Sequence, residues 1–188
     1  MFLSKLNYSM NNKLRNILLL ATLGIIVVSY AGCGVSIPKG AKAIKPFKKD
    51  KYLGKWYEIA RMDFKFEKDL NNVTATYTLE DGAIKVDNRG YNDVKKEWKQ
   101  SIGKAKFVND ENEARLKVSF FGPFYAGYNV IEIDADYQYA LVAGNSLDYL
   151  WILSRKPTIP EEIKAAYLKK AKDIGYKTAE LVWTKHDQ

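Results

Sequence analysis

The sequence has only one cysteine and one histidine among its 188 residues. A single cysteine excludes a disulfide within the chain, and a single histidine argues against a zinc site built from cysteine and histidine ligands. The same scarcity argues against the nucleophilic mechanisms that pair serine or cysteine with histidine. We therefore expect no metal and no cofactor, and any catalysis would depend on carboxylates, lysine or tyrosine.

Proline is also scarce, with 5 residues, whereas aromatic residues make up 13% of the chain and include 13 tyrosines. This composition favours β-strands, in which flat rings pack on a pleated surface. The hydrophobic share of 47% and the charged share of 28% are ordinary for a globular protein, so a disordered chain and a multi-span membrane protein are excluded. The length fits one domain, with or without a processed leader.

The beginning of the chain has the pattern of a secretory leader. Residues 1–16 contain three basic residues and no acid, and Ile17–Tyr30 then runs without a charge for 14 residues. That run is shorter than the roughly 20 residues of a membrane-spanning helix, so we predict a signal peptide over residues 1–32 rather than a stable anchor. Met10 stands directly before a compact basic region, so either Met1 or Met10 is the start of translation.

The single cysteine, Cys33, directly follows this leader. Ala31-Gly32-Cys33 resembles the lipobox of bacterial lipoproteins, with Tyr30 where leucine is usual. The resemblance implies that the Cys33 thiol receives a diacylglyceryl group, that the leader is removed before it, and that the new amino group is acylated. More than one acyl chain would give stable membrane attachment. Gly34, in place of the aspartate that retains lipoproteins at the inner membrane, indicates the outer membrane. The alternative is a cysteine that lies by chance in an ordinary signal or anchor helix.

A basic segment follows the cysteine. The leader removes three of the 30 basic residues and no acid, which leaves 27 against 22 and lowers the net charge from +8 to +5. Seven lysines lie between Val35 and Lys55, with Asp50 as the one acid. We interpret residues 33–51 as a lipidated N-terminus and basic tether that lies near anionic headgroups or is a solvated linker. A nucleic-acid partner would need aromatics interleaved with basic residues on a folded surface, and we predict none.

The remainder of the chain predicts an all-β domain over residues 52–188. Eight stretches rich in Val, Ile, Tyr, Phe and Thr alternate with turn residues, and short connections favour an antiparallel up-and-down barrel over a sandwich. A helix capped by Thr158 and stopped by Gly175, and a short final strand at Thr178–Thr184, follow the barrel. The eight predicted strands are Lys55–Met62, Asn72–Leu79, Ile84–Tyr91, Glu97–Phe107, Ala114–Phe120, Gly127–Ile133, Tyr137–Ala143 and Tyr149–Ser154.

Alternating strands divide the connections between two ends of the barrel. One end has the tight, acidic connections at Glu80-Asp81, Asp110-Glu111 and Asp134/Asp136. The other end is predicted to be apolar and basic, and aromatic side chains in its loops indicate a mouth that meets lipid. The alternative is that these aromatics fold back as a plug. This second set of connections comprises Asp63–Asn71, Tyr91–Lys96 and Phe121–Tyr125.

Two short motifs lie at the closed, acidic end of this barrel. Gly54-Lys55-Trp56-Tyr57 opens the first strand, and Trp151-Ile152-Leu153-Ser154-Arg155 ends the eighth. Together they resemble the lipocalin signature. A guanidinium of Arg155 over the indole of Trp56 would cap the barrel floor by stacking and cation–π attraction. Gly54, Trp56 and Arg155 are therefore expected to be structural rather than catalytic.

The resemblance extends from Tyr52 to Trp183 and is specific within that superfamily. Segments at 52–61, 72–77, 117–124 and 149–155 resemble the bacterial outer-membrane lipocalins, which have plant and apolipoprotein D relatives. It implies a lipid-anchored protein with its barrel on the periplasmic side, which binds and carries fatty acids or lysophospholipids for envelope maintenance and is not an enzyme.

The alternation of strand residues predicts which side chains face the lumen. Tyr125 and Trp151 match positions that the family places in the cavity, and each offers an apolar ring with one polar group. Arg61, Lys65, Lys95 and Lys96 could attract an anionic headgroup at the mouth. The other expected ligand-binding residues are Tyr77, Val73, Ala75, Ile84, Val86, Asn88, Leu116, Val118 and Phe120.

Other functions remain open from the sequence. A lipid-modifying enzyme could use Glu58 with Tyr77 for acid–base chemistry, although a buried glutamate is more often a hydrogen-bonded structural group. A barrel with a filled lumen could instead act as a protein- or membrane-interaction module. A homodimer through exposed apolar positions is plausible, and pigment or isoprenoid ligands would also suit an apolar cavity.

Overall fold

The computed structural model describes residues 35–187 of the chain. The predicted signal peptide and Cys33 lie outside the described residues. Within them, no helix is both long and apolar enough to cross a membrane.

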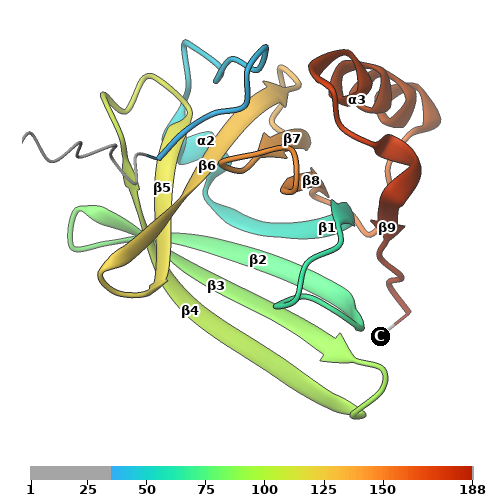
Figure 1. Ribbon diagram of the computed structural model, residues 1–188. Helices are drawn as coiled ribbons and strands as arrows, with labels where there is room; N and C mark the ends of the chain where they lie inside the picture. The colour runs from blue at the N-terminus through green and yellow to red at the C-terminus, as the bar shows by residue number, and fades with distance from the viewer. Residues whose placement is uncertain (1–34, 188) are drawn as a thin grey trace, which may run out of the picture. The chain divides into compact units, whose positions relative to one another are not determined.

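Eight antiparallel strands close into a barrel (Figure 1). Each strand pairs with the next along the chain, and β1 closes the barrel because it pairs with β8 on one side and with β2 on the other. The predicted barrel, helix and short final strand are confirmed. The barrel strands are β1 (Gly54–Met62), β2 (Leu70–Glu80), β3 (Ala83–Asn92), β4 (Glu97–Phe107), β5 (Arg115–Phe121), β6 (Phe124–Ile133), β7 (Tyr139–Ala143) and β8 (Leu150–Ser154).

Most predicted strand boundaries differ from the observed ones by one to three residues, and the final strand begins at Leu181 rather than at Thr178. The expected long connection at Phe121–Tyr125 is a tight turn, because Phe121 and Phe124 already pair with each other at the ends of β5 and β6. Strand β7 begins at Tyr139 rather than at Tyr137, which has a positive φ of 57°. The carboxylate of Asp134 accepts hydrogen bonds from the backbone N–H groups that follow it, and this extends the turn.

The C-terminal part covers one side of the barrel (Figure 1). Helix α3 (Glu161–Ile174) ends at Gly175, whose φ of 113° suits glycine, as predicted. The predicted cap by Thr158 is wrong, because Pro160 is the N-cap residue and no side chain caps this helix. After the short 3-10 turn η1 (Thr178–Glu180), β9 (Leu181–Trp183) pairs with the part of β1 that β2 leaves free.

The segment before the barrel is packed against it. The backbone N–H of Ile44 donates to the carbonyl of Val130, and the ring of Phe47 is buried in the barrel core. The short helix α2 (Lys49–Tyr52) follows, and its last residue, Tyr52, is buried in the same core. The sequence predicts a tether over residues 33–51, whereas from Val35 onward this segment is part of the folded unit. Phe47 and Ile44 are the apolar residues that fix it there.

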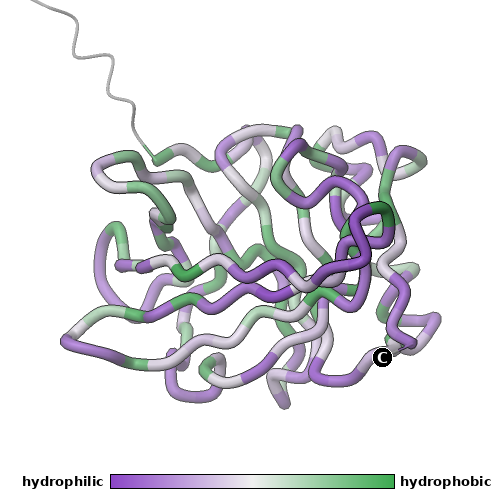
Figure 2. Tube along the Cα trace, turned by 90° about the horizontal axis from the view of Figure 1, so that it is seen from below, coloured by the Kyte–Doolittle hydropathy of each residue, from purple (hydrophilic) through white to green (hydrophobic). Residues whose placement is uncertain are grey.

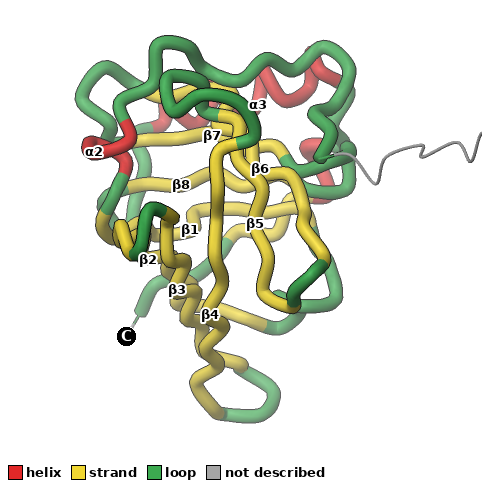
Figure 3. The backbone as a smooth tube through the Cα atoms, turned by 90° about the vertical axis from the view of Figure 1, so that its left-hand side faces the viewer, coloured by secondary structure: helices red, strands yellow, loops and turns green. Residues whose placement is uncertain are grey.

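Two apolar clusters hold the fold together. One fills the barrel around Trp56, and the other lies between the outer face of β7 and β8 and helix α3. Strands β7 and β8 are therefore buried on both faces, whereas the β3–β4 hairpin extends away from the rest (Figure 3) and exposes Trp98 and Ile102. Along many strands in Figure 2, hydrophobic and hydrophilic residues alternate, as a sheet with one inner and one outer face requires.

Candidate functional site

The barrel encloses a cavity of about 520 Å³. This lies within the range of roughly 300–1,000 Å³ that small-molecule sites occupy. All eleven residues that the sequence places in the lumen line this cavity. Strand alternation points ten of them inward, whereas Tyr125 lies on the same face of the sheet as Lys117 and borders the cavity at its opening. The eleven residues are Val73, Ala75, Tyr77, Ile84, Val86, Asn88, Leu116, Val118, Phe120, Tyr125 and Trp151.

Trp151 lies in a row of aromatic rings along one wall. Its ring is stacked between Tyr128 and Tyr149, with centroid distances of 6.4 and 6.3 Å. Its indole Nε1 donates to Oε2 of Glu67 at 3.2 Å, so one face of the ring remains apolar while its polar group is satisfied. Tyr125 lies nearer the opening, where the Lys117 ammonium is 5.2 Å from its ring centre.

The closed end of the barrel is capped by Trp56 and Arg155. The guanidinium carbon of Arg155 lies 3.8 Å from the centre of the Trp56 ring, and the indole is fully buried. The guanidinium also donates to the backbone carbonyls of Lys51, Leu53, Lys55 and Tyr137. Gly54 has a φ of 92°, a backbone conformation that favours glycine.

Three tyrosine side chains meet above this cap. The hydroxyl of Tyr128 lies 2.6 Å from that of Tyr52 and 2.8 Å from that of Tyr77. Burial raises the pKa of all three phenols, so they are neutral at physiological pH. Only Tyr77 is predicted from the sequence. Tyr52 precedes the first predicted strand, and Tyr128, which lies within the predicted strand Gly127–Ile133, is not among the expected ligand-binding residues.

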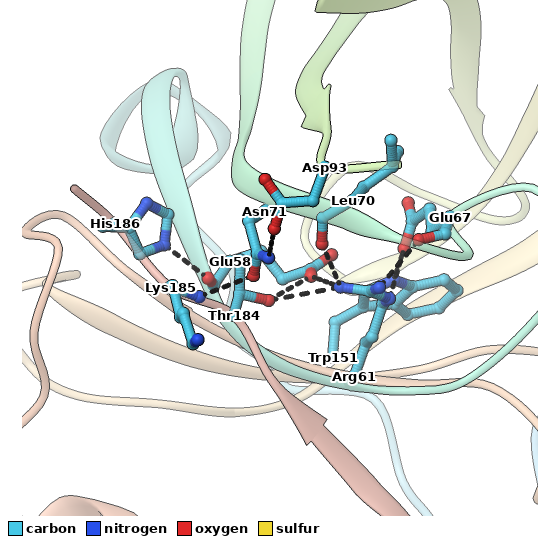
Figure 4. Close-up of polar contacts among 10 residues, drawn as sticks. All are labelled: Glu58, Arg61, Glu67, Leu70, Asn71, Asp93, Trp151, Thr184, Lys185 and His186. Atoms are coloured by element: carbon cyan, nitrogen blue, oxygen red, sulfur yellow. Dashed lines mark hydrogen bonds and ion pairs between the residues drawn. The ribbon is translucent and has the colours of Figure 1, made fainter. Parts of the chain in front are cut away.

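A buried ion cluster lies around the second half of β1, nearer the mouth than Trp56 (Figure 4). Arg61 donates to Oε1 of Glu58 at 2.7 Å and to the backbone carbonyl of Glu67 at 2.7 Å. Oε1 of Glu58 also accepts from the hydroxyl of Thr184 at 2.6 Å. The backbone carbonyl of Glu58 contacts Nε2 of His186 at 2.7 Å, so the C-terminal segment is fastened to the same cluster.

Glu67 has the most perturbed carboxyl group of this cluster. Burial raises its pKa well above the ordinary value of 4.5, and the nearby Glu58 raises it further, whereas Arg61 lowers it. Arg61 lies between the two carboxyl groups, with Nη1 2.7 Å from Oε1 of Glu58 and Nε 3.7 Å from Oε2 of Glu67. Glu58 and Glu67 both line the cavity. The sequence identifies neither as part of a cluster, because strict strand alternation places Glu58 and Arg61 on opposite faces. The β-bulge between Glu58 and Ala60 brings both side chains to the same face.

The expected role of Arg61 at the mouth is wrong. Its side chain is 1% exposed and is enclosed by Glu58, Glu67 and Thr184, so it is not available to a headgroup. Lys99 is a cationic residue that lines the cavity, whereas the guanidinium of Arg89, another lining residue, lies over the ring of Trp98 at 4.3 Å from its centre. The alternative of an acid–base pair of Glu58 and Tyr77 is not formed, because Glu58 bonds to Arg61 and Thr184 while Tyr77 bonds to Tyr128.

The mouth of the barrel carries exposed aromatic side chains. Phe66, Phe121 and Phe124, which we call the aromatic rim, are 64%, 71% and 78% exposed and all line the opening of the cavity. The alternative, in which these aromatics fold back as a plug, is therefore wrong for these three residues. Phe64 behaves differently, because its ring packs at 5.9 Å from that of Trp151 inside the barrel.

Comparisons with known proteins agree with this geometry. A family model described as a lipocalin-like domain matches residues 47–186. The outer membrane lipoprotein Blc of Citrobacter freundii is 52% identical over 149 residues, which cover 79% of this chain and 84% of that protein. The protein of the same name from Escherichia coli K12 is 48% identical over 164 residues, covering 87% and 92%.

Solved structures extend the similarity in fold. Insecticyanin from the tobacco hornworm Manduca sexta matches with a TM-score of 0.66 over 82% of this chain and 89% of its own, at 15% sequence identity. At that identity the match concerns the fold alone.

Proposed function

The chain belongs to the lipocalin family, and we propose that it is a membrane-anchored carrier whose barrel binds one fatty acid or lysophospholipid. The observation that supports this most directly is the cavity of about 520 Å³ with its mostly aliphatic and aromatic wall. Each methylene group that leaves water for such a wall gains about 0.8 kcal/mol, so ten of them gain roughly 8 kcal/mol before the costs of association. A single acyl chain uses this kind of space well.

A carrier accounts for the cavity better than the other candidate functions do. A filled barrel acting as an interaction module would leave no room for a ligand. An enzyme would need reactive groups that meet in the lumen, and the carboxylate and phenol considered from the sequence have separate partners. The family consists generally of binding and transport proteins, which favours the same reading.

The membrane anchor is part of the proposal. Lipidation of Cys33 would hold the protein at the outer membrane with its barrel on the periplasmic side, and two relatives are named outer membrane lipoproteins. Val35 follows Cys33 by two residues, which span at most about 7 Å. Ser36 donates to the backbone carbonyl of Asn145, in the connection that leads into β8 at the mouth. The anchor would therefore keep the aromatic rim near the membrane from which lipid is taken.

Native mass spectrometry tests this function on the full-length protein purified from membranes and freed of non-covalently bound lipid. We expect saturable uptake of one palmitic acid or one palmitoyl lysophospholipid per barrel. Ala75→Phe and Val118→Phe add volume to the wall and should lower the affinity at least tenfold, with the circular dichroism spectrum unchanged. The matched control is Ile102→Phe, because Ile102 is 49% exposed on the outer face of β4.

Absence of binding by the folded wild-type protein, or equal binding by all three variants, would contradict a lipid-filled lumen. Fractionation of cells that express Cys33→Ala tests the anchor separately, because that variant should be absent from the outer-membrane fraction.

A further inference from the structure

Three tyrosines form a line of hydroxyl groups at the inner end of the cavity. They come from separate parts of the chain, Tyr52 from α2, Tyr77 from β2 and Tyr128 from β6. The hydroxyl of Tyr128 is central, at 2.6 Å from Tyr52 and 2.8 Å from Tyr77. All three residues line the cavity.

The position of this group is at the floor rather than at the mouth. The Tyr52 ring lies 5.0 Å from Trp56 and 5.5 Å from Tyr77. Tyr77 in turn pairs with Gly54 across the sheet, at the end that Arg155 caps. The hydroxyl groups therefore form the inner end of the cavity.

The number of protons exceeds the number of hydrogen bonds within the group. Three hydroxyls supply three protons, and the two contacts among them use two. Among residues 35–187, no other hydrogen-bond partner of these hydroxyls is recorded. One buried O–H donor thus remains for a group inside the cavity. The phenols keep this proton, because burial raises their pKa.

A second polar group on the same wall is also without a partner. Oδ1 of Asn88 is buried and accepts no hydrogen bond, and Asn88 lines the cavity. Asn88 pairs with Ala75 on β2, one inward-facing position above the pair of Tyr77 and Val86. The lower cavity therefore offers one free donor and one free acceptor, while its other wall residues include Ile84, Val86 and Leu116.

These two groups match the chemistry of a carboxylic acid. In its protonated form, which burial in the cavity favours, the acid has a carbonyl oxygen that accepts one hydrogen bond and a hydroxyl that donates one. A terminal methyl group would leave both protein groups unsatisfied at a free-energy cost. We propose that Tyr52, Tyr77 and Tyr128, together with Asn88, form a subsite for the carboxyl end of a fatty acid, which enters the barrel carboxyl group first. This inference rests on the proposed lipid-binding function and assigns the orientation of its ligand.

The competing orientation places the carboxylate at the mouth. There, Lys99 is the cation that lines the cavity, since Arg61 is paired with Glu58 and the guanidinium of Arg89 lies over the ring of Trp98. A lysophospholipid has to adopt this second orientation, because its headgroup cannot enter an apolar channel. Substitutions of the three tyrosines should therefore change the affinity for a fatty acid but not the affinity for a lysophospholipid.

Binding of palmitic acid and of palmitoyl lysophosphatidylcholine to the full-length protein tests the orientation. Tyr128→Phe should weaken palmitic acid binding about tenfold and leave the lysophospholipid unchanged. Lys99→Gln should leave palmitic acid unchanged. Tyr57→Phe is the matched control, because Tyr57 is on the outer face of β1 beside His186, with ring centroids 5.4 Å apart.

An equal effect of Tyr128→Phe on both ligands, no effect on either, or a loss of palmitic acid binding in Lys99→Gln would overturn the inference.

A second measurement uses palmitic acid labelled with ¹³C at the carboxyl carbon and a water-soluble paramagnetic agent. The labelled signal should be protected from broadening. A broadened signal would place the carboxyl group at the mouth and overturn the orientation while leaving the proposed function intact. Failure of the folded wild-type protein to bind either lipid would refute the proposed function itself.

Discussion

The two ends of the barrel use aromatic side chains in opposite ways. At the closed end, Trp56 is fully buried under Arg155, and the guanidinium donates four hydrogen bonds to backbone carbonyls. At the mouth, Phe121 and Phe124 are more than two-thirds exposed. Buried rings contribute to the free energy of unfolding, whereas exposed rings contribute little to it and are free to contact lipid. The comparison separates residues that hold the fold from residues that serve binding.

Removal of the ring at the closed end should have the largest effect on stability. We expect Trp56→Ala to lower the free energy of unfolding by about 3–5 kcal/mol, because it leaves a cavity and removes the surface on which Arg155 stacks. Urea unfolding followed by circular dichroism measures this. Trp183→Ala is the matched control, because Trp183 is 42% exposed. A similar loss in both variants would show that burial does not distinguish the two ends.

Loss of the central cation of the ion cluster should rank next. Arg61→Leu is expected to destabilise the fold by about 3 kcal/mol, because it leaves the buried Glu58 carboxylate without its partner. The double variant Glu58→Gln/Arg61→Leu should recover part of that loss in the same urea experiment. Recovery would be absent if Arg61 acted only through its bonds to backbone carbonyls.

The pH dependence of stability should reveal Glu67. Its pKa is raised in the folded state by burial and by Glu58, so the unfolded chain loses this proton first as the pH rises. The contribution of Glu67 is fully present below the ordinary value of 4.5 and is lost as the pH rises through the folded-state pKa. Glu67→Gln should remove this decline between pH 4.5 and neutral pH. An unchanged slope in thermal melts at several pH values would contradict the assignment.

Changes to the aromatic rim should affect stability least. Phe121→Ser/Phe124→Ser is expected to alter the free energy of unfolding by less than about 0.5 kcal/mol per site, because both rings are exposed. The same variant should slow the uptake of a fluorescent fatty acid from phosphatidylcholine vesicles several-fold. Leu79→Ser is the control, because Leu79 is 48% exposed at the closed end. Equal uptake rates for the two variants would remove the rim from the transfer route.

Much of the cavity follows from local periodicity. Successive residues of a strand point to opposite faces, so Val73, Ala75 and Tyr77 had to share one face once the strand was identified. The signature residues Trp56 and Arg155 were recognisable as a pair because they match a family pattern. Errors arose where nonlocal contacts decide, as for Phe47, whose burial depends on backbone bonding between its segment and strands far away in the chain.

The sequence by itself determined the barrel, the order of its strands, the inward face of each strand and the aromatic character of the mouth, because these depend on residues that are neighbours in the chain. Only the tertiary structure decided that Arg61 pairs with Glu58 instead of facing a ligand. It also decided that the hydroxyl of Tyr128 forms hydrogen bonds with those of Tyr52 and Tyr77. Closure of the barrel brings the three tyrosine hydroxyls within hydrogen-bond distance, and the β-bulge in β1 brings Glu58 and Arg61 to one face. Burial then determines their charge, because a group removed from water keeps only the protonation state that its new neighbours stabilise.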